Sequence, residues 1–170
     1  MGNLTNKIND TGYTTPYMAG LDILGDNVEA IDKFIKSVLL LPRSIQKIMQ
    51  SFSAAEFIED KLGAVFNLSA EQKYQIAVVV KDILFSKTFL GDMPKEIQAK
   101  LGVSPDVAAK VAAMIVSDLF GPAIEEIKKA QSTAFSDRLA GKSAEPPRTF
   151  SNPAAALDIN KDNVLDLRNK

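Results

Sequence analysis

The residues best suited to chemistry lie late in the chain, where side-chain oxygens recur at alternate positions. Asp158, Asn160 and Asp162 occupy positions 1, 3 and 5 of a calcium-binding pattern, and Asp166 occupies position 9, which often binds the ion through water. Calcium prefers oxygen ligands of this kind. A calcium-binding or calcium-responsive tail is therefore one candidate function.

This spacing is similar to that of EF-hand and dockerin loops, although two positions differ. Asn163 stands at position 6, where glycine is usual, and Asn169 stands at position 12, where these loops carry a bidentate carboxylate. Asparagine tolerates the left-handed backbone that position 6 needs. We expect only weak calcium binding, and a solvated acidic tail is the competing interpretation.

The same tail also suits a docking peptide, because apolar and charged residues alternate along it. The residues that would contact a partner are Val164, Leu165, Leu167 and Arg168. Such a run can add a strand to a partner's sheet, and it follows a proline-containing tether. We place this motif at 157–170, within a tail over 134–170 that we expect to be largely disordered.

Two tyrosines lie in a polar, glycine-containing N-terminal arm, which we expect to be flexible over 1–21. A hydrophobic core would not explain Tyr13 and Tyr17 in such an arm. We predict that they anchor it on its own domain or on a neighbouring subunit.

Two residue types that commonly perform catalysis are absent, because the chain has no Cys and no His. Their absence excludes thiolate nucleophiles, disulfides, the usual zinc ligands and the usual general base. Asp82 and Asp118 lie near apolar helix positions, but no partner base is identifiable, and we interpret them as solvated. We predict a non-catalytic protein with no cofactor.

Charge and hydropathy limit the partners. Lys and Arg total 20 against 21 for Asp and Glu, so the formal net charge is −1. This balance predicts no long-range field that would attract nucleic acid or an anionic membrane.

No stretch reaches the ~18 apolar residues of a membrane span, and no secretory signal is visible. We expect a cytoplasmic chain.

The elements that would position any site are helical. A stripe at Val28, Ile31, Ile35, Val38 and Leu39 predicts a helix from 26 to about 41. Further helices are predicted after residue 42, at about 53–66, 70–88, 93–101, 105–120 and 123–132. The helix at 70–88 is apolar nearly all round, which predicts a buried central helix; a strand over 76–80 is the competing prediction.

Helix starts are indicated by capping boxes, in which a short polar residue precedes Glu or Gln by three positions. These pairs are Asp26 with Glu29, Ser53 with Glu56, and Ser69 with Gln72. Gly102 predicts that the preceding helix ends in a left-handed conformation, and Ser104-Pro105 predicts that a new helix begins there. Gly121-Pro122 predicts a break in the helix that follows.

The apolar residues around the second helix have two interpretations. The run 38–41 and the face with Ile45, Met49 and Phe52 could form an exposed binding patch. Core packing is the more frequent use of such residues, and we favour it.

An internal repeat links about 54–88 with about 93–120. Ile58-x-x-Lys61-Leu62-Gly63 matches Ile97-x-x-Lys100-Leu101-Gly102, and Leu68-Ser69 to Leu84-Phe85 matches Val103-Ser104 to Leu119-Phe120. The first copy has four extra residues after its glycine. Each unit would be a short helix, a glycine stop, a serine cap and a long helix, and two packed copies would bury each other's apolar faces.

The duplicated pattern, over roughly 42–131, resembles duplicated helical segments of uncharacterised proteins from ultrasmall candidate-phylum bacteria. The resemblance implies no activity and no site residues.

The segment 97–111 also resembles the helix-turn-helix of transcription regulators, which makes nucleic-acid binding a further alternative. A DNA-reading helix presents Arg, Gln, Asn or Ser to base edges and phosphates. Here Lys110 is the only basic side chain of that helix, and Asp106 has the wrong sign for phosphate. We therefore favour a packed helical hairpin and predict no nucleic-acid partner.

Together these observations predict an all-α compact bundle of about six helices over 22–133, containing a duplicated helical-hairpin unit, with a flexible N-terminal arm and C-terminal tail. The expected function is a non-catalytic protein-interaction or assembly module that uses the helical core and the C-terminal motif. The expected partner is another protein or a second copy of the chain.

Overall fold

The computed structural model describes residues 12–142, and the elements within that range are all helical, as expected. The elements are α1 (Pro16–Leu24), α2 (Val28–Leu39), α3 (Arg43–Gln50), α4 (Phe52–Glu56), η3 (Phe57–Leu62), α5 (Gly63–Phe66), α6 (Ala70–Leu84), η4 (Leu90–Asp92), α7 (Met93–Leu101), α8 (Pro105–Met114), η5 (Ile115–Leu119), η6 (Gly121–Ala123), α9 (Ile124–Ala134) and α10 (Ser136–Lys142). The expected number of helices, about six, is too low. The competing strand over 76–80 is wrong, because those residues lie inside α6.

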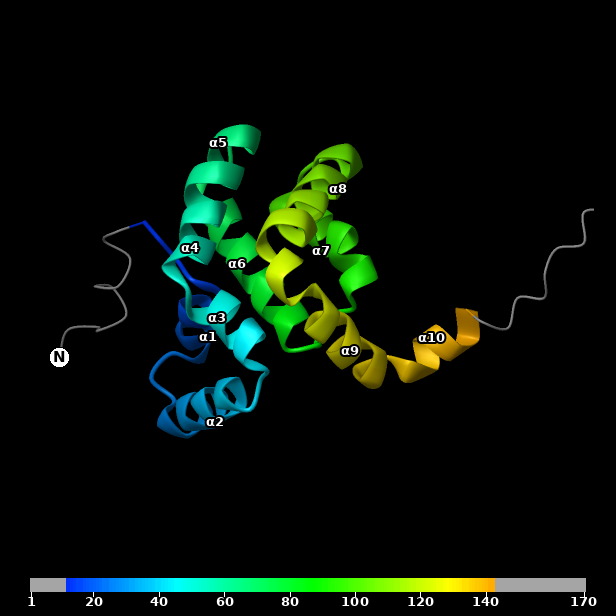
Figure 1. Cartoon of the computed structure of the whole chain (residues 1–170). Helices are drawn as coiled ribbons and strands as arrows, with labels where there is room; N and C mark the ends of the chain where they lie inside the picture. The colour runs from blue at the N-terminus through cyan, green and yellow to red at the C-terminus, as the bar shows by residue number, and fades with distance from the viewer. Residues whose placement is uncertain (1–11, 143–170) are drawn as a thin grey trace, which may run out of the picture.

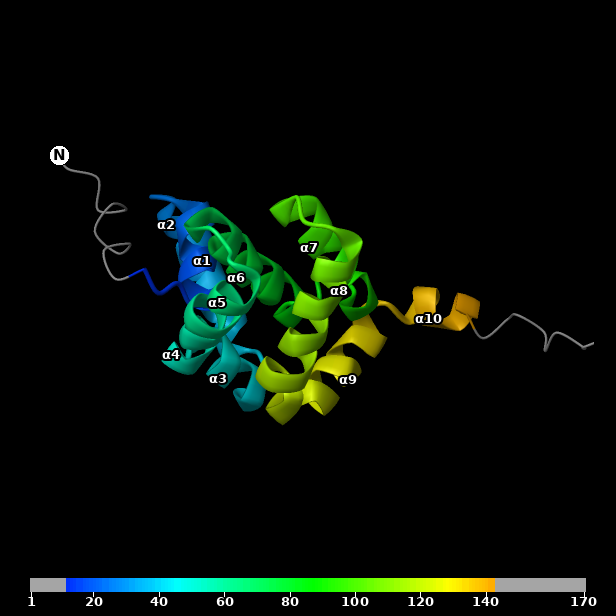
Figure 2. The ribbon, with the colours of Figure 1, turned by 90° about the horizontal axis from the view of Figure 1, so that it is seen from above.

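Figure 1 shows α6 running through the middle of the molecule, with α1 to α5 on one side and α7 to α9 on the other. The view from above separates the same two groups (Figure 2). In both views α10 extends away from the rest, and α2 lies at the edge of the molecule in Figure 1.

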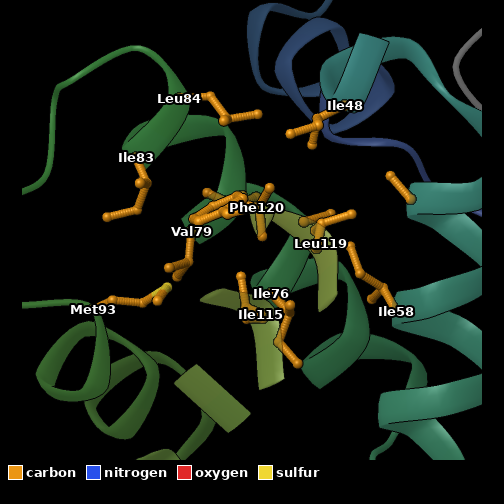
Figure 3. Close-up of a cluster of buried hydrophobic side chains, with 14 of the residues drawn as sticks. Ile48, Ile58, Ile76, Val79, Ile83, Leu84, Met93, Ile115, Leu119 and Phe120 are labelled. Atoms are coloured by element: carbon orange, nitrogen blue, oxygen red, sulfur yellow. The ribbon is translucent and has the colours of Figure 1, made fainter. Parts of the chain in front are cut away.

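The core forms around α6, whose residues 76–80 are all buried. Phe120 is fully buried and lies among Val79, Ile115 and Leu119 (Figure 3). The β-branched residues of α6 carry a small helix penalty, which burial outweighs. This confirms the predicted central, buried helix.

Matched positions of the two repeat units have matched environments. Ile58 and Ile97 are both fully buried, and so are Ile76 and Val111. Ser69 and Ser104 both cap helices, with side-chain oxygens that accept from Gln72 N and Val107 N. At Ser69 the predicted capping box is complete, because the Gln72 side chain accepts from the Ser69 N–H.

The predicted glycine stop is confirmed in only one unit. Gly102 adopts the left-handed conformation with φ 65° and ends α7. Gly63 is helical, with φ −54°, and the chain continues to Phe66 before Asn67 takes the left-handed position with φ 48°. The four extra residues add about one turn of helix, which moves the stop from Gly63 to Asn67.

Two other predicted caps are wrong by one or two residues. The cap of α2 is Asn27, whose side chain accepts from Ala30 N, rather than Asp26. The cap of α4 is Ser51, which accepts from Ala54 N, while Ser53 lies inside the helix. A cap must have extended backbone next to the first helical turn, and Asn27 and Ser51 meet that condition.

The predicted boundaries of the flexible ends are also wrong. Residues 16–21 belong to α1, because Thr15 caps that helix, Pro16 is its first residue, and Ala19 and Gly20 are buried in the fold. At the other end, α9 and α10 continue the helical structure to Lys142, past the predicted boundary at 134. The rest of the predicted tail lies outside the described residues.

Within residues 12–142, no single helix is long and apolar enough to cross a membrane. One pair, 105–119 with 121–134, reaches that length and apolarity only when taken together, and it is bent by 63°. The bend falls at Gly121-Pro122, where the sequence predicts a break.

Candidate functional site

The most unusual surface of the described chain is the outer face of α2. Val28, Ile35 and Leu39 lie on one stripe of this helix, and their exposed fractions are 78%, 37% and 63%. Leu40, just after the helix, is 86% exposed. The stripe is the basis for predicting the helix, and the structure shows that much of it faces solvent.

The adjacent part of the same apolar arc holds α2 on the domain. The Phe34 ring packs between Tyr17 and Phe85, with centroid distances of 5.6 Å and 5.5 Å. It also covers Gly20, where a Cβ would lie 2.3 Å from Phe34 Cζ. Val38 is buried beside it.

The width of the apolar arc explains why the stripe is left exposed. Its residues, at 28, 31, 34, 35, 38 and 39, spread over about half the circumference of the helix. The side chains of Phe34 and Val38 dock on the domain, and this contact turns Val28, Ile35 and Leu39 outward. That width is the sequence signal by which the exposed stripe could have been recognised.

The acidic and basic residues of α2 follow a fixed order along the helix. Glu29 and Asp32 come first along the helix, and Lys33 and Lys36 follow them. Lys36 Nζ and Asp32 Oδ2 are 2.6 Å apart, and both side chains are mostly exposed. A weak surface pair of this kind can exchange partners at little cost.

The two predicted tyrosines contact their own domain. Tyr13 Oη donates to the carboxylate of Asp60 at 3.0 Å, and its ring lies 5.1 Å from that of Phe52. The hydrogen bond to Asp60 raises the pKa of Tyr13 above its ordinary value. Tyr17 is partly buried against the core. These contacts agree with the hypothesis that the two tyrosines anchor the N-terminal segment on its own domain and not on a neighbouring subunit.

The predicted patch around the second helix divides into two parts. Ile45 and Met49 are fully buried, so the core interpretation holds for them. Leu39 and Leu40 are exposed, and Phe52 remains 59% exposed although its ring contacts Tyr13.

The interpretation of two carboxylates as solvated is incomplete, because each has a cationic partner. Asp118 Oδ2 lies 2.6 Å from Lys61 Nζ, and these residues belong to the two π-helical segments η5 and η3. Asp82 Oδ1 lies 3.1 Å from Nζ of the buried Lys81. No local sequence pattern indicates the pair of Lys61 and Asp118, because these residues are far apart in the chain.

The predicted calcium ligands and docking residues, from Asp158 to Arg168, lie outside the described residues and stay predictions. Among residues 12–142, no group of three or more acidic side chains is placed to hold a metal ion. In the region that resembles a helix-turn-helix, α7 and α8 pack together through Ile97, Leu101 and Val111, and Asp106 and Lys110 are exposed.

Comparisons with known proteins add no relative to this picture. No family model, no curated protein and no solved structure matches the chain. We therefore infer the function from the surfaces of the molecule itself.

Proposed function

We propose that the chain is a non-catalytic assembly module in which the exposed face of α2 binds the same face of a second copy. The observation that carries this proposal is the apolar stripe of Val28, Ile35 and Leu39, of which Val28 and Leu39 are mostly exposed and Ile35 is about one-third exposed. Fully burying an aliphatic side chain contributes about 1.5–3 kcal/mol, so exposing several together favours association.

The charges of α2 support a second copy as the partner. In an antiparallel pair, Val28 of one copy lies beside Leu39 of the other, and Glu29 lies beside Lys36. The acidic start of α2 in each copy thus lies beside the basic end of α2 in the other copy. The contact occurs twice, because a two-fold axis repeats it. A parallel pair would instead bring the two acidic starts to the same end.

The size of α2 is compatible with a modest interface. The helix has 12 residues and is therefore about 18 Å long. Leu40, which directly follows the helix, is also exposed and extends the apolar surface. An interface built mainly on one such helix per copy is expected to be small, so dimer formation should depend on protein concentration.

The proposal is tested by sedimentation equilibrium over a range of concentrations. We expect the wild-type chain to show a monomer–dimer equilibrium and Ile35→Glu to be monomeric. Val65→Glu is the matched control, since Val65 is 60% exposed on α5, at the opposite end of the molecule from α2 in Figure 1. Circular dichroism checks that both variants keep their helices.

Charge reversal tests the antiparallel arrangement separately. Glu29→Lys alone and Lys36→Glu alone should each weaken the dimer, because like charges then face each other. The double variant should recover most of the affinity, and the effect should shrink at high salt. A chain that stays monomeric at millimolar concentration, or a dimer that survives Ile35→Glu, would contradict the proposal.

A further inference from the structure

A second surface, distinct from the face of α2, is a pocket of about 990 Å³ between α3, η3 and the segment η5–η6. Ile48, Phe57 and Leu119 give it an apolar wall. No described residue of α2 is among those that line it. The volume is in the range of pockets that hold small organic ligands.

The charge of this pocket is positive. Arg43, Lys47 and Lys61 line it, and Asp118 is the only carboxylate among its lining residues. Asp118 is paired with Lys61 at 2.6 Å. Within residues 12–142, no carboxylate forms an ion pair with Arg43 or Lys47, so two cations remain to attract an anion.

The pocket also contains an unsatisfied hydroxyl. Ser44 lines it, and the Oγ atom of Ser44 is shielded from solvent without a hydrogen-bond partner among the described residues. A buried hydroxyl without a partner is rare and unfavourable in folded proteins. Rotation of the Ser44 side chain toward the pocket would let this hydroxyl donate to a ligand oxygen there.

The walls of the pocket come from both π-helical segments. Phe57 and Lys61 belong to η3, and Asp118 and Leu119 belong to η5. Single π-helical turns occur often at functional sites, because the wider turn displaces side chains from the ordinary helical pattern. Here each segment directs both a charged and an apolar residue to the same pocket.

We propose that this pocket binds a small organic oxyanion. Its phosphate or carboxylate group lies between Arg43 and Lys47 and accepts a hydrogen bond from the hydroxyl of Ser44. Its apolar body lies against Phe57. This inference does not depend on the proposed dimer.

The test is an NMR titration of the ¹⁵N-labelled full chain with three probes: inorganic phosphate, phenyl phosphate and benzoate. We expect at least one aromatic probe to shift the amides of α3 and η3 and to bind about tenfold more tightly than inorganic phosphate. Binding of phenyl phosphate but not of benzoate would identify the ligand group as a phosphate. Binding of benzoate but not of phenyl phosphate would identify it as a carboxylate. The titration is repeated on Ile35→Glu, in which binding should persist.

Variants separate a ligand site from a general basic surface. Lys47→Ala should weaken binding about tenfold, whereas Lys95→Ala, which removes an exposed cation of α7, should leave it unchanged. Ser44→Ala should raise the melting temperature, because it removes the unpaired hydroxyl, and should still weaken binding. Two results would overturn the proposal: no shift with either aromatic probe at millimolar concentration, or equal losses in the Lys47 and Lys95 variants.

Discussion

Lys61 and Asp118 join η3 and η5, the two π-helical segments within residues 12–142, with 2.6 Å between Nζ and Oδ2. Ser117 Oγ also donates to Asp118, at 2.6 Å from Oδ1. The pair connects the first repeat unit to the end of the long helix of the second. It is largely exposed, so it contributes little energy but fixes one edge of the pocket.

The Lys61–Asp118 pair predicts a pH dependence of stability. The hydrogen bond from Lys61, and then that from Ser117, lowers the pKa of Asp118 below its ordinary value. The stabilisation is therefore complete above the ordinary aspartate pKa of about 3.9 and is lost as the pH falls through the lower folded value. Urea unfolding should show wild type and Asp118→Asn converging below about pH 4. In a Lys61→Gln background, most of the difference between Asp and Asn should already be absent at neutral pH.

Gly20 is predicted to be essential for the docking of α2. A Cβ at this position would meet the Phe34 ring at 2.3 Å, so Gly20→Ala must displace the ring. We expect a loss of about 1–3 kcal/mol in the free energy of unfolding, measured with urea. Gly121→Ala is the control, because a Cβ there has no neighbour within 4 Å. Equal losses of stability in the Gly20 and Gly121 variants would show that the packing of Phe34 does not depend on its close approach to Gly20.

Gln131 is predicted to hold α9 against the end of α6 and the segment that follows it. Its Oε1 accepts from Leu90 N at 2.9 Å, and its Nε2 donates to Ile83 O and Thr88 O at 3.1 Å and 3.0 Å. Gln131→Leu keeps the volume but leaves these backbone groups without partners, so we expect a loss of about 2–4 kcal/mol in unfolding experiments. Gln98→Leu, at an exposed site of α7, should change stability by no more than about 0.5 kcal/mol.

The two serines at the start of α4 give a direct comparison of a true and an apparent cap. Ser51 accepts from Ala54 N at 3.1 Å, whereas Ser53 only donates to Ser51 Oγ. Ser51→Ala should lower thermal stability by about 1 kcal/mol, and Ser53→Ala should have less than half that effect. The reverse order would mean that α4 begins two residues later, as the capping-box pattern predicts.

Features that depend on neighbours within one helical turn could be predicted from the sequence alone. The capping box of Ser69 and Gln72, the left-handed Gly102, the Ser104 cap and the break at Gly121-Pro122 all use contacts three or four residues apart. The all-α class and the buried centre of α6 follow from apolar spacing, which is also a local property.

The contacts of each apolar face depend on how the helices pack in three dimensions. The stripe of α2 has the same period as a core face, but its exposure depends on Phe34 finding Gly20, Tyr17 and Phe85 elsewhere in the chain. The Lys61–Asp118 pair and the pocket beside it likewise bring together residues from separate helices. Helix periodicity specifies which side of a helix is apolar, whereas burial depends on the packing of distant segments, and so the exposed face and the pocket emerge only in the folded molecule.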